Sequence, residues 1–154
     1  MIYVLFILLG ITLFQDVKYR GVHWSVFPLL LAGTAIYRVG LIDWLHVGYN
    51  LLFLIVLMST LTLYLSLKQG FIVNITRGYF SWGDILFLLA IIPLFDLRGY
   101  MLLFVFGTFS TLIIHGIVHL FKKQNSVPYA GYMALLTALF IVFKAEITNL
   151  TNVI

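Results

Sequence analysis

Residues 81–90 read Ser81-Trp82-Gly83-Asp84-Ile85-Leu86-Phe87-Leu88-Leu89-Ala90 and place a carboxylate, directly after a glycine, at the start of an apolar run. An ionisable side chain at the edge of a bilayer is energetically costly, so it indicates a functional site. Such a carboxylate is expected to have a partner elsewhere in the chain. The best candidate is Asp16, which follows the first apolar run in the same way.

The composition is that of a membrane protein. Of 154 residues, 63% are hydrophobic and only 9% are charged, whereas a soluble domain has about 25% charged residues. Apolar runs recur along the whole length, and helices are the expected spanning element because no alternating barrel strands occur. We therefore expect an all-α, polytopic integral membrane protein made of one transmembrane domain over residues 1–154, with the lipid bilayer as its environment.

Several kinds of site are excluded by residue content. The chain has no cysteine, which rules out disulfides, thiolate zinc sites and a cysteine nucleophile. The net charge of +4 comes without a dense basic cluster, so nucleic acid is not an expected partner. His115 and His119 are spaced for one helix face, but without a third ligand they are interpreted as packing or interfacial residues, and no metal is expected.

Six membrane spans are predicted, at about residues 1–15, 22–37, 46–67, 84–95, 100–121 and 128–143. The first would reach roughly 22 Å, less than a core of about 30 Å. It must therefore thin the bilayer or continue helically past Asp16. It has no basic leader region or cleavage site, so it is expected to be retained rather than removed as a signal peptide. Residues 68–83, rich in aromatic and aliphatic side chains, are expected to lie in the membrane interface.

Basic residues in the short loops predict the orientation. Loops one, three and five carry six basic residues and the other side carries three, which puts those loops in the cytoplasm and both termini outside. The six are Lys18, Arg20, Lys68, Arg77, Lys122 and Lys123, and the three are Arg38, Arg98 and Lys144. Asp16 and Asp84 then lie at the same, cytoplasmic face of the cell membrane.

The acidic residues fall into two groups. Asp43, Asp96 and Glu146 each lie near a basic neighbour on the outer side and are interpreted as loop charges. Asp16 and Asp84 each adjoin an apolar span. The structural alternative for both is a charge at the end of a helix, which for Asp84 would be favoured by the helix dipole.

Two carboxylates at one site suit peptide hydrolysis. Because they cannot both ionise easily, they share one proton and titrate as a unit. One then acts as general base toward a water molecule, and the other donates a hydrogen bond to the scissile carbonyl. Gly83 would let a substrate backbone approach Asp84. Trp82, like Trp24 and Trp44, lies near the end of a span and is either an interfacial anchor or part of the substrate entry.

These residues resemble the motifs of the type IV prepilin peptidases, membrane aspartyl proteases that include the archaeal preflagellin peptidases. The family has one aspartate after its first span, in a pattern close to Asp-x(5)-Ile-Pro-Asn, and a second in Gly-x-Gly-Asp-x-Lys at its fourth span. The matching segments here are 16–24 (Asp-Val-Lys-Tyr-Arg-Gly-Val-His-Trp) and 81–86 (Ser-Trp-Gly-Asp-Ile-Leu). Before the last span, 128–134 (Pro-Tyr-Ala-Gly-Tyr-Met-Ala) is similar to the family's Pro-Phe-Gly-Pro-Phe-Leu-Ala.

The sequence departs from the family at three places: Val22-His23-Trp24 replaces Ile-Pro-Asn, Ser81 replaces the first glycine, and Leu86 replaces the lysine. The resemblance implies an aspartic endopeptidase, without a cofactor, that removes leaders from prepilin-like protein substrates, with Asp16 and Asp84 as catalytic residues. The chain is similar to the short members that lack N-methyltransferase activity. The alternative is a non-catalytic membrane protein, either a degenerate relative or a small transporter subunit with Asp84 as an ion or proton site.

Overall fold

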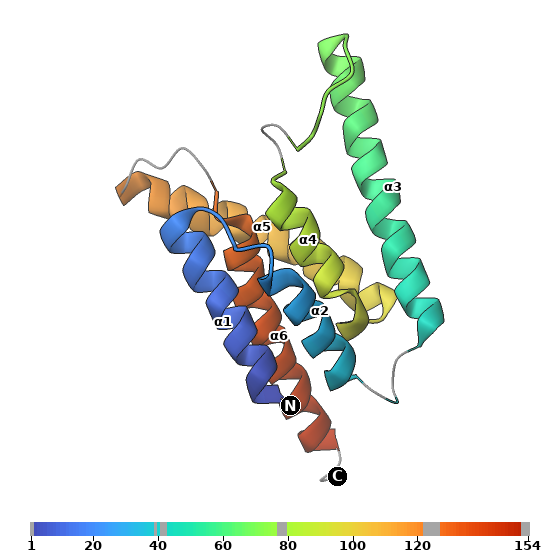
Figure 1. Ribbon diagram of the computed structural model, residues 1–154, viewed down its shortest axis with the longest axis vertical. Coiled ribbons are helices and arrows are strands. Elements are labelled where there is room, and N and C mark those ends of the chain that lie inside the picture. The colour runs from blue at the N-terminus through green and yellow to red at the C-terminus, as the bar shows by residue number, and fades with distance from the viewer. Residues whose placement is uncertain (1, 39, 41–42, 77–79, 122–126, 152–154) are drawn as a thin grey trace.

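The computed structural model describes residues 2–38, 40, 43–76, 80–121 and 127–151, and the part of the chain that it describes is helical, without strands (Figure 1). The all-α prediction is thus confirmed. The elements are α1 (Ile2–Tyr19), α2 (Val26–Tyr37), α3 (Trp44–Gln69), α4 (Trp82–Ala90), the 3-10 helix η1 (Ile92–Leu94), α5 (Leu97–Phe121) and α6 (Tyr129–Thr151).

The helices pack around α1 and α6, which lie side by side (Figure 1). The helix α2 packs on α1, and α4 packs on both α2 and α6. The helix α5 passes behind α6, whereas α3 packs mainly against α5 and η1 and projects away from the bundle (Figure 1). As a result, the carboxy-terminal end of α1 and the amino-terminal ends of α2, α4 and α6 lie at one end of the molecule.

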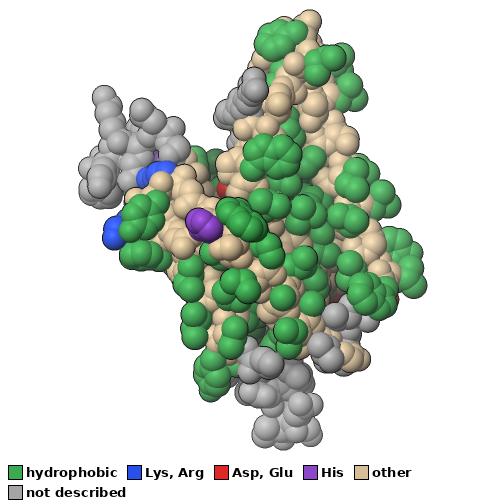
Figure 2. Space-filling view, in the orientation of Figure 1, with side chains coloured by type: hydrophobic (Ala, Val, Ile, Leu, Met, Phe, Trp, Pro, Cys, Tyr) green, Lys and Arg blue, Asp and Glu red, His purple; other side chains and the backbone are tan. Residues whose placement is uncertain are grey.

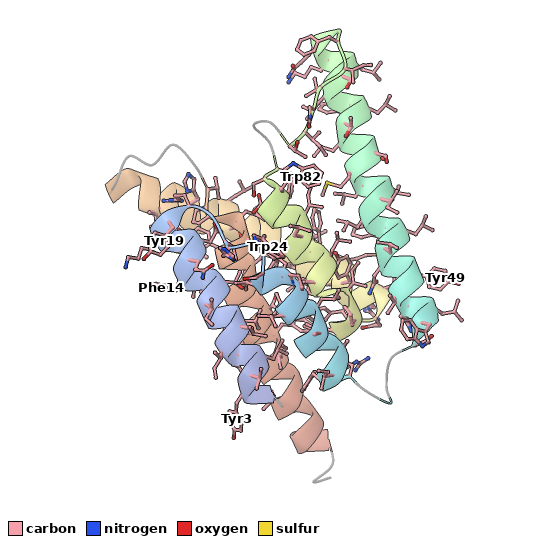
Figure 3. All side chains as sticks on the ribbon, in the orientation of Figure 1. Tyr3, Phe14, Tyr19, Trp24, Tyr49 and Trp82 are labelled. Atoms are coloured by element: carbon pink, nitrogen blue, oxygen red, sulfur yellow. The ribbon has the colours of Figure 1, made fainter. Side chains whose placement is uncertain are left out.

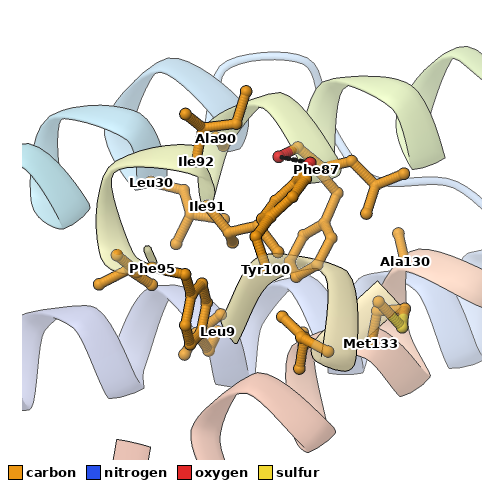
Figure 4. Packing of buried hydrophobic residues seen from close by; sticks show 14 of the residues in the cluster. Leu9, Leu30, Phe87, Ala90, Ile91, Ile92, Phe95, Tyr100, Ala130 and Met133 are labelled. Atoms are coloured by element: carbon orange, nitrogen blue, oxygen red, sulfur yellow. Dashed lines mark hydrogen bonds between the residues drawn. The ribbon is translucent and has the colours of Figure 1, made fainter. Parts of the chain in front are cut away.

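The buried core joins all of these helices (Figure 4). Its fully buried members include Leu5 of α1, Leu30 of α2, Phe87 of α4 and Met133 of α6. Large apolar side chains also cover the outside, with few charged groups among them on the face shown in Figure 2. Three described helices, α1, α3 and α5, are long and apolar enough to cross a membrane, whereas α2, α4 with η1, and the apolar part of α6 are shorter.

A break between α4 and η1 exposes carbonyl groups that other helices satisfy. Pro93 cannot donate the backbone hydrogen bond that would continue α4. The hydroxyl of Tyr100 donates to the carbonyl of Leu88 at 3.0 Å, and the hydroxyl of Thr34 donates to that of Ala90 at 2.8 Å. The amide of Asn50, fully buried on α3, donates to the carbonyls of Ile92 and Phe95 at 3.2 and 2.7 Å. Backbone carbonyls in an apolar environment need such partners.

Several predicted boundaries are corrected. Helix α1 runs to Tyr19, beyond the predicted end at residue 15, which agrees with the alternative that the helix continues past Asp16. Helix α2 begins at Val26 rather than at residue 22, because a turn closed by the 3.0 Å bond from Val26 N to His23 O precedes it. The predicted span 84–95 is two helices because of Pro93, and α6 extends past residue 143 to Thr151.

The connection after α3 folds back on that helix. Gly70, with φ +74°, ends α3 in the left-handed region that favours glycine. The amide of Val73 then donates to the hydroxyl of Ser66 at 3.0 Å, and Val73 and Ile75 pack on Leu65. The interfacial placement of this connection stays a prediction, and part of it, residues 77–79, lies outside the described residues, as do Lys122 and Lys123 of the charge count.

Aromatic side chains lie near both ends of the bundle. Figure 3 shows Tyr19, Trp24 and Trp82 near the end where α6 begins, and Tyr3 and Tyr49 nearer the opposite end. All five are exposed. Two such groups are typical of the two interfaces of a membrane.

Candidate functional site

Asp16 lies on the buried face of α1. Its spacing from Leu5, Leu9 and Thr12 follows the helical repeat, so the stripe that faces the core ends in this carboxylate. The side chain is 7% exposed. Its Oδ2 accepts a 2.7 Å hydrogen bond from the backbone amide of Gly131 on α6.

Asp84 lies in the first turn of α4, where it forms a capping box with Ser81. The amide of Asp84 donates to Ser81 Oγ at 3.2 Å, and the amide of Ser81 donates to Asp84 Oδ2 at 2.9 Å. The other oxygen, Oδ1, accepts from the backbone amide of Ala130 at 3.1 Å. Asp84 is 8% exposed. Each of its two oxygens therefore accepts a backbone hydrogen bond while the side chain is largely buried.

The two carboxylates meet at the amino-terminus of α6. The first hydrogen bond within this helix runs from the amide of Tyr132 to the carbonyl of Pro128, so the preceding amides need partners from outside it. Asp84 accepts a hydrogen bond from the amide of Ala130, and Asp16 accepts one from the amide of Gly131.

Consecutive residues lie about 3.8 Å apart, and Asp16 and Asp84 interact electrostatically. The two carboxyl groups are therefore held by neighbouring donors at one helix end. The positive end of the α6 dipole favours negative charge at this place.

Gly131 lets α1 approach α6 closely. A Cβ atom at this position would lie 3.1 Å from Asp16 Cβ, 3.3 Å from Asp16 Oδ2 and 3.4 Å from the carbonyl oxygen of Leu13. The two separations from Asp16 are tighter than an ordinary van der Waals contact, and the one from Leu13 is at its lower limit. A side chain here would therefore push α6 away from Asp16.

Tyr129 anchors the start of α6 beside this site. Its hydroxyl shares a 3.0 Å hydrogen bond with Thr108 Oγ1 of α5. Its ring packs edge-on against Phe80, with 5.2 Å between the ring centroids. These contacts hold the amides of Ala130 and Gly131 in place for the two carboxylates.

The two predicted substrate-binding residues lie next to Asp84 in the first turn of α4. Trp82 is 66% exposed and is labelled at the start of α4 in Figure 3. Gly83 has room for a methyl group, which would be 3.5 Å from Ser81 Oγ and 3.6 Å from Phe27 Cζ. Packing within the chain therefore does not require glycine at this position, and the substrate roles of both residues stay predictions.

Sequence reasoning missed two parts of the site. The capping function of Ser81 could have been read from the Ser-x-x-Asp spacing before an apolar run. The hydrogen bonds from Ala130 and Gly131 to the aspartates were indicated only indirectly, by the motif-like segment at residues 128–134. Leu86, at the place of the family's lysine, packs against the hydrophobic core.

The described residues include no group of three or more His, Cys, Asp or Glu side chains that could hold a metal ion. The site consists of two largely buried carboxyl groups that accept hydrogen bonds from consecutive backbone amides at the start of α6. No protein-family model, curated protein or solved structure matches this chain, so the interpretation depends on the geometry itself.

Proposed function

We propose that this protein is a membrane-embedded aspartic endopeptidase that removes the leader of prepilin-like precursors, with Asp16 and Asp84 as its catalytic pair. The observation that carries the proposal is the convergence of both carboxylates on consecutive amides of α6. The two residues are 68 positions apart in the sequence (84 minus 16) and come from different helices. Their convergence is what a two-carboxylate hydrolase requires.

The chemistry is addition of water to a peptide bond. The ionised carboxylate takes a proton from water as the water oxygen bonds to the carbonyl carbon, and the protonated carboxyl donates its proton to the carbonyl oxygen. The resulting diol then collapses. Its hydroxyl proton returns to the second carboxylate, the carbon–nitrogen bond breaks, and the first carboxyl protonates the leaving nitrogen. The pair ends with the single proton it began with.

The placement in the membrane forms part of the same proposal. We infer that all six helices lie in the bilayer of the cell membrane, with the shorter α2 and α4 accommodated by their packing against α1 and α6. The excess of basic residues in loops one, three and five supports a site at the cytoplasmic face, with both termini outside. A substrate whose apolar helix lies in the same bilayer would present the adjoining peptide bond at this depth.

A second candidate function is non-catalytic. Three of the four carboxylate oxygens accept hydrogen bonds from helix-end amides, and such caps stabilise helices without any reaction. A degenerate relative would keep this arrangement for stability alone. A transporter subunit with Asp84 as an ion or proton site would be a further variant of this class.

Cleavage of a co-expressed prepilin-like precursor distinguishes these functions. Asp16→Asn and Asp84→Asn should each abolish cleavage, while the protein remains in the membrane fraction. Asp43→Asn is a matched control, because Asp43 caps α3 through the amide of Leu45 and is not part of the site. Cleavage by both site variants at the wild-type rate would refute the proposal.

A further inference from the structure

We propose that the two aspartates have fixed and different protonation roles: Asp84 is the ionised base that takes the proton from water, and Asp16 is the protonated acid that donates to the scissile carbonyl. This assignment rests on the proposed peptidase function for its chemical meaning. The asymmetry on which it depends is a property of the folded chain and can be tested without a substrate.

The first argument is the number of donors aimed at each carboxyl group. Asp84 accepts backbone hydrogen bonds on both oxygens, from Ser81 at 2.9 Å and from Ala130 at 3.1 Å. Asp16 accepts one, on Oδ2, from Gly131 at 2.7 Å. Hydrogen bonds from N–H groups stabilise the charged form of a carboxyl group, so the pair's negative charge is better placed on Asp84.

The second argument is the position of each residue in its own helix. Asp84 lies in the first turn of α4, where the positive end of the helix dipole favours a negative charge. Asp16 lies in the last turn of α1, where the negative end disfavours one. The α6 amino-terminus donates one backbone hydrogen bond to each residue, at 2.7 Å to Asp16 and 3.1 Å to Asp84. The dipoles of α1 and α4 therefore favour the negative charge on Asp84, as the backbone hydrogen bonds also do.

The charged and titratable side chains near Asp16 do not reverse this asymmetry. Arg20, one turn after Asp16, favours a charged Asp16, but it is partly exposed and water weakens the attraction. Lys18 lies over the rings of Phe14 and Tyr19, at 5.0 and 5.1 Å from their centroids, instead of against the site. His23 is exposed and pairs with Ser25.

Asp16 Oδ1 is the oxygen on which the proton would lie. Among hydrogen bonds between described residues, none is accepted by this atom, whereas every other carboxylate oxygen of the pair has a backbone donor. A proton on Oδ1 would leave the bond from Gly131 to Oδ2 intact. The hydroxyl group so formed could then donate to a substrate carbonyl.

The first test compares the thermal stability of two asparagine variants in detergent at neutral pH. Asp16→Asn can keep its carbonyl oxygen toward Gly131 and place its NH₂ where the carboxyl O–H would be, so its unfolding temperature should stay within about 2 °C of wild type. In Asp84→Asn, either side-chain orientation points the NH₂ group at a backbone N–H. Its unfolding temperature should fall by about 3–10 °C. Equal losses, or a larger loss for Asp16→Asn, would overturn the assignment.

A second test uses the unsubstituted protein, so it does not depend on whether Asp84→Asn folds. A diazoacetyl amide esterifies a protonated carboxyl group: the acid protonates the diazo carbon, nitrogen gas leaves, and the carboxylate oxygen bonds to that carbon. Peptide mass spectrometry after treatment at neutral pH should find the ester on Asp16. An ester on Asp84 would refute the assignment. Cleavage assays are independent of both tests, so a failed assignment with Asp-dependent cleavage would leave the proposed function standing.

Discussion

Replacing Gly131 by alanine should uncouple α6 from the proposed catalytic pair, Asp16 and Asp84, while leaving the bundle folded. The added methyl group would meet Asp16 Cβ at 3.1 Å and Asp16 Oδ2 at 3.3 Å, and also the carbonyl oxygen of Leu13 at 3.4 Å. The two tight contacts are both with Asp16, whose Cβ is fixed to the α1 backbone, and the contact with Leu13 is at the lower limit of the ordinary range. The start of α6 must therefore move by a few tenths of an ångström, away from Asp16.

The magnitude follows from the hydrogen bond that this movement lengthens. The bond from Gly131 N to Asp16 Oδ2 is 2.7 Å long. Asp16 becomes charged as it gives its proton to the substrate carbonyl, and a hydrogen bond to a charged group contributes about 1.5–3 kcal/mol. A loss of about 1–3 kcal/mol in the transition state corresponds to a decrease of roughly 5- to 150-fold in kcat/KM. Stability should change less, because alanine in place of glycine stabilises a helix by about 0.5–1 kcal/mol.

The assay is cleavage of a prepilin-like precursor by purified protein, with the unfolding temperature measured in the same detergent. Gly10→Ala is the matched control, because Gly10 lies on α1 and an added Cβ would meet nothing within 4 Å. It should cleave at the wild-type rate. If Gly131→Ala also cleaved within twofold of wild type, the contact between α6 and Asp16 would have no catalytic importance and the reasoning would be wrong.

Three further predictions concern the proposed substrate site, the stability of the helical bundle and the pH dependence of cleavage. Gly83→Ala should slow cleavage without lowering the unfolding temperature, because its methyl group makes only ordinary contacts, at 3.5 and 3.6 Å, with the chain; unchanged cleavage would remove Gly83 from the substrate site. Thr34→Val leaves the carbonyl of Ala90 without its 2.8 Å hydrogen-bond donor. The free energy of unfolding should fall by about 0.6–1.7 kcal/mol and the unfolding temperature by roughly 1–7 °C, with cleavage retained. An unchanged unfolding temperature would show that this hydrogen bond is unimportant for stability. The cleavage rate should fall at both low and high pH, because only the singly protonated pair is active, and a profile that falls on one side alone would contradict a shared proton.

Much of the local structure was predictable from composition and pattern. The share of apolar residues predicts helices in a membrane-like environment, and the all-α fold is confirmed. The helix ends were predicted less well, since they depend on single residues such as Pro93, which splits the fourth predicted span, and Ser81, which caps α4 from outside it. Six spans were expected, and three of the described helices have the length and apolarity to cross a membrane by themselves.

The sequence by itself determined that Asp16 and Asp84 lie at ends of apolar helices, since each follows or begins a run that a charge interrupts. It also indicated a common membrane face for them, through the loop charges. Only the tertiary structure decided what holds them there. The packing of α1 and α4 against α6 brings each carboxylate to a different amide of the same helix end. Backbone amides look alike in every sequence, so which of them lack a partner, and which carboxylates lie within reach, emerges only when the helices pack.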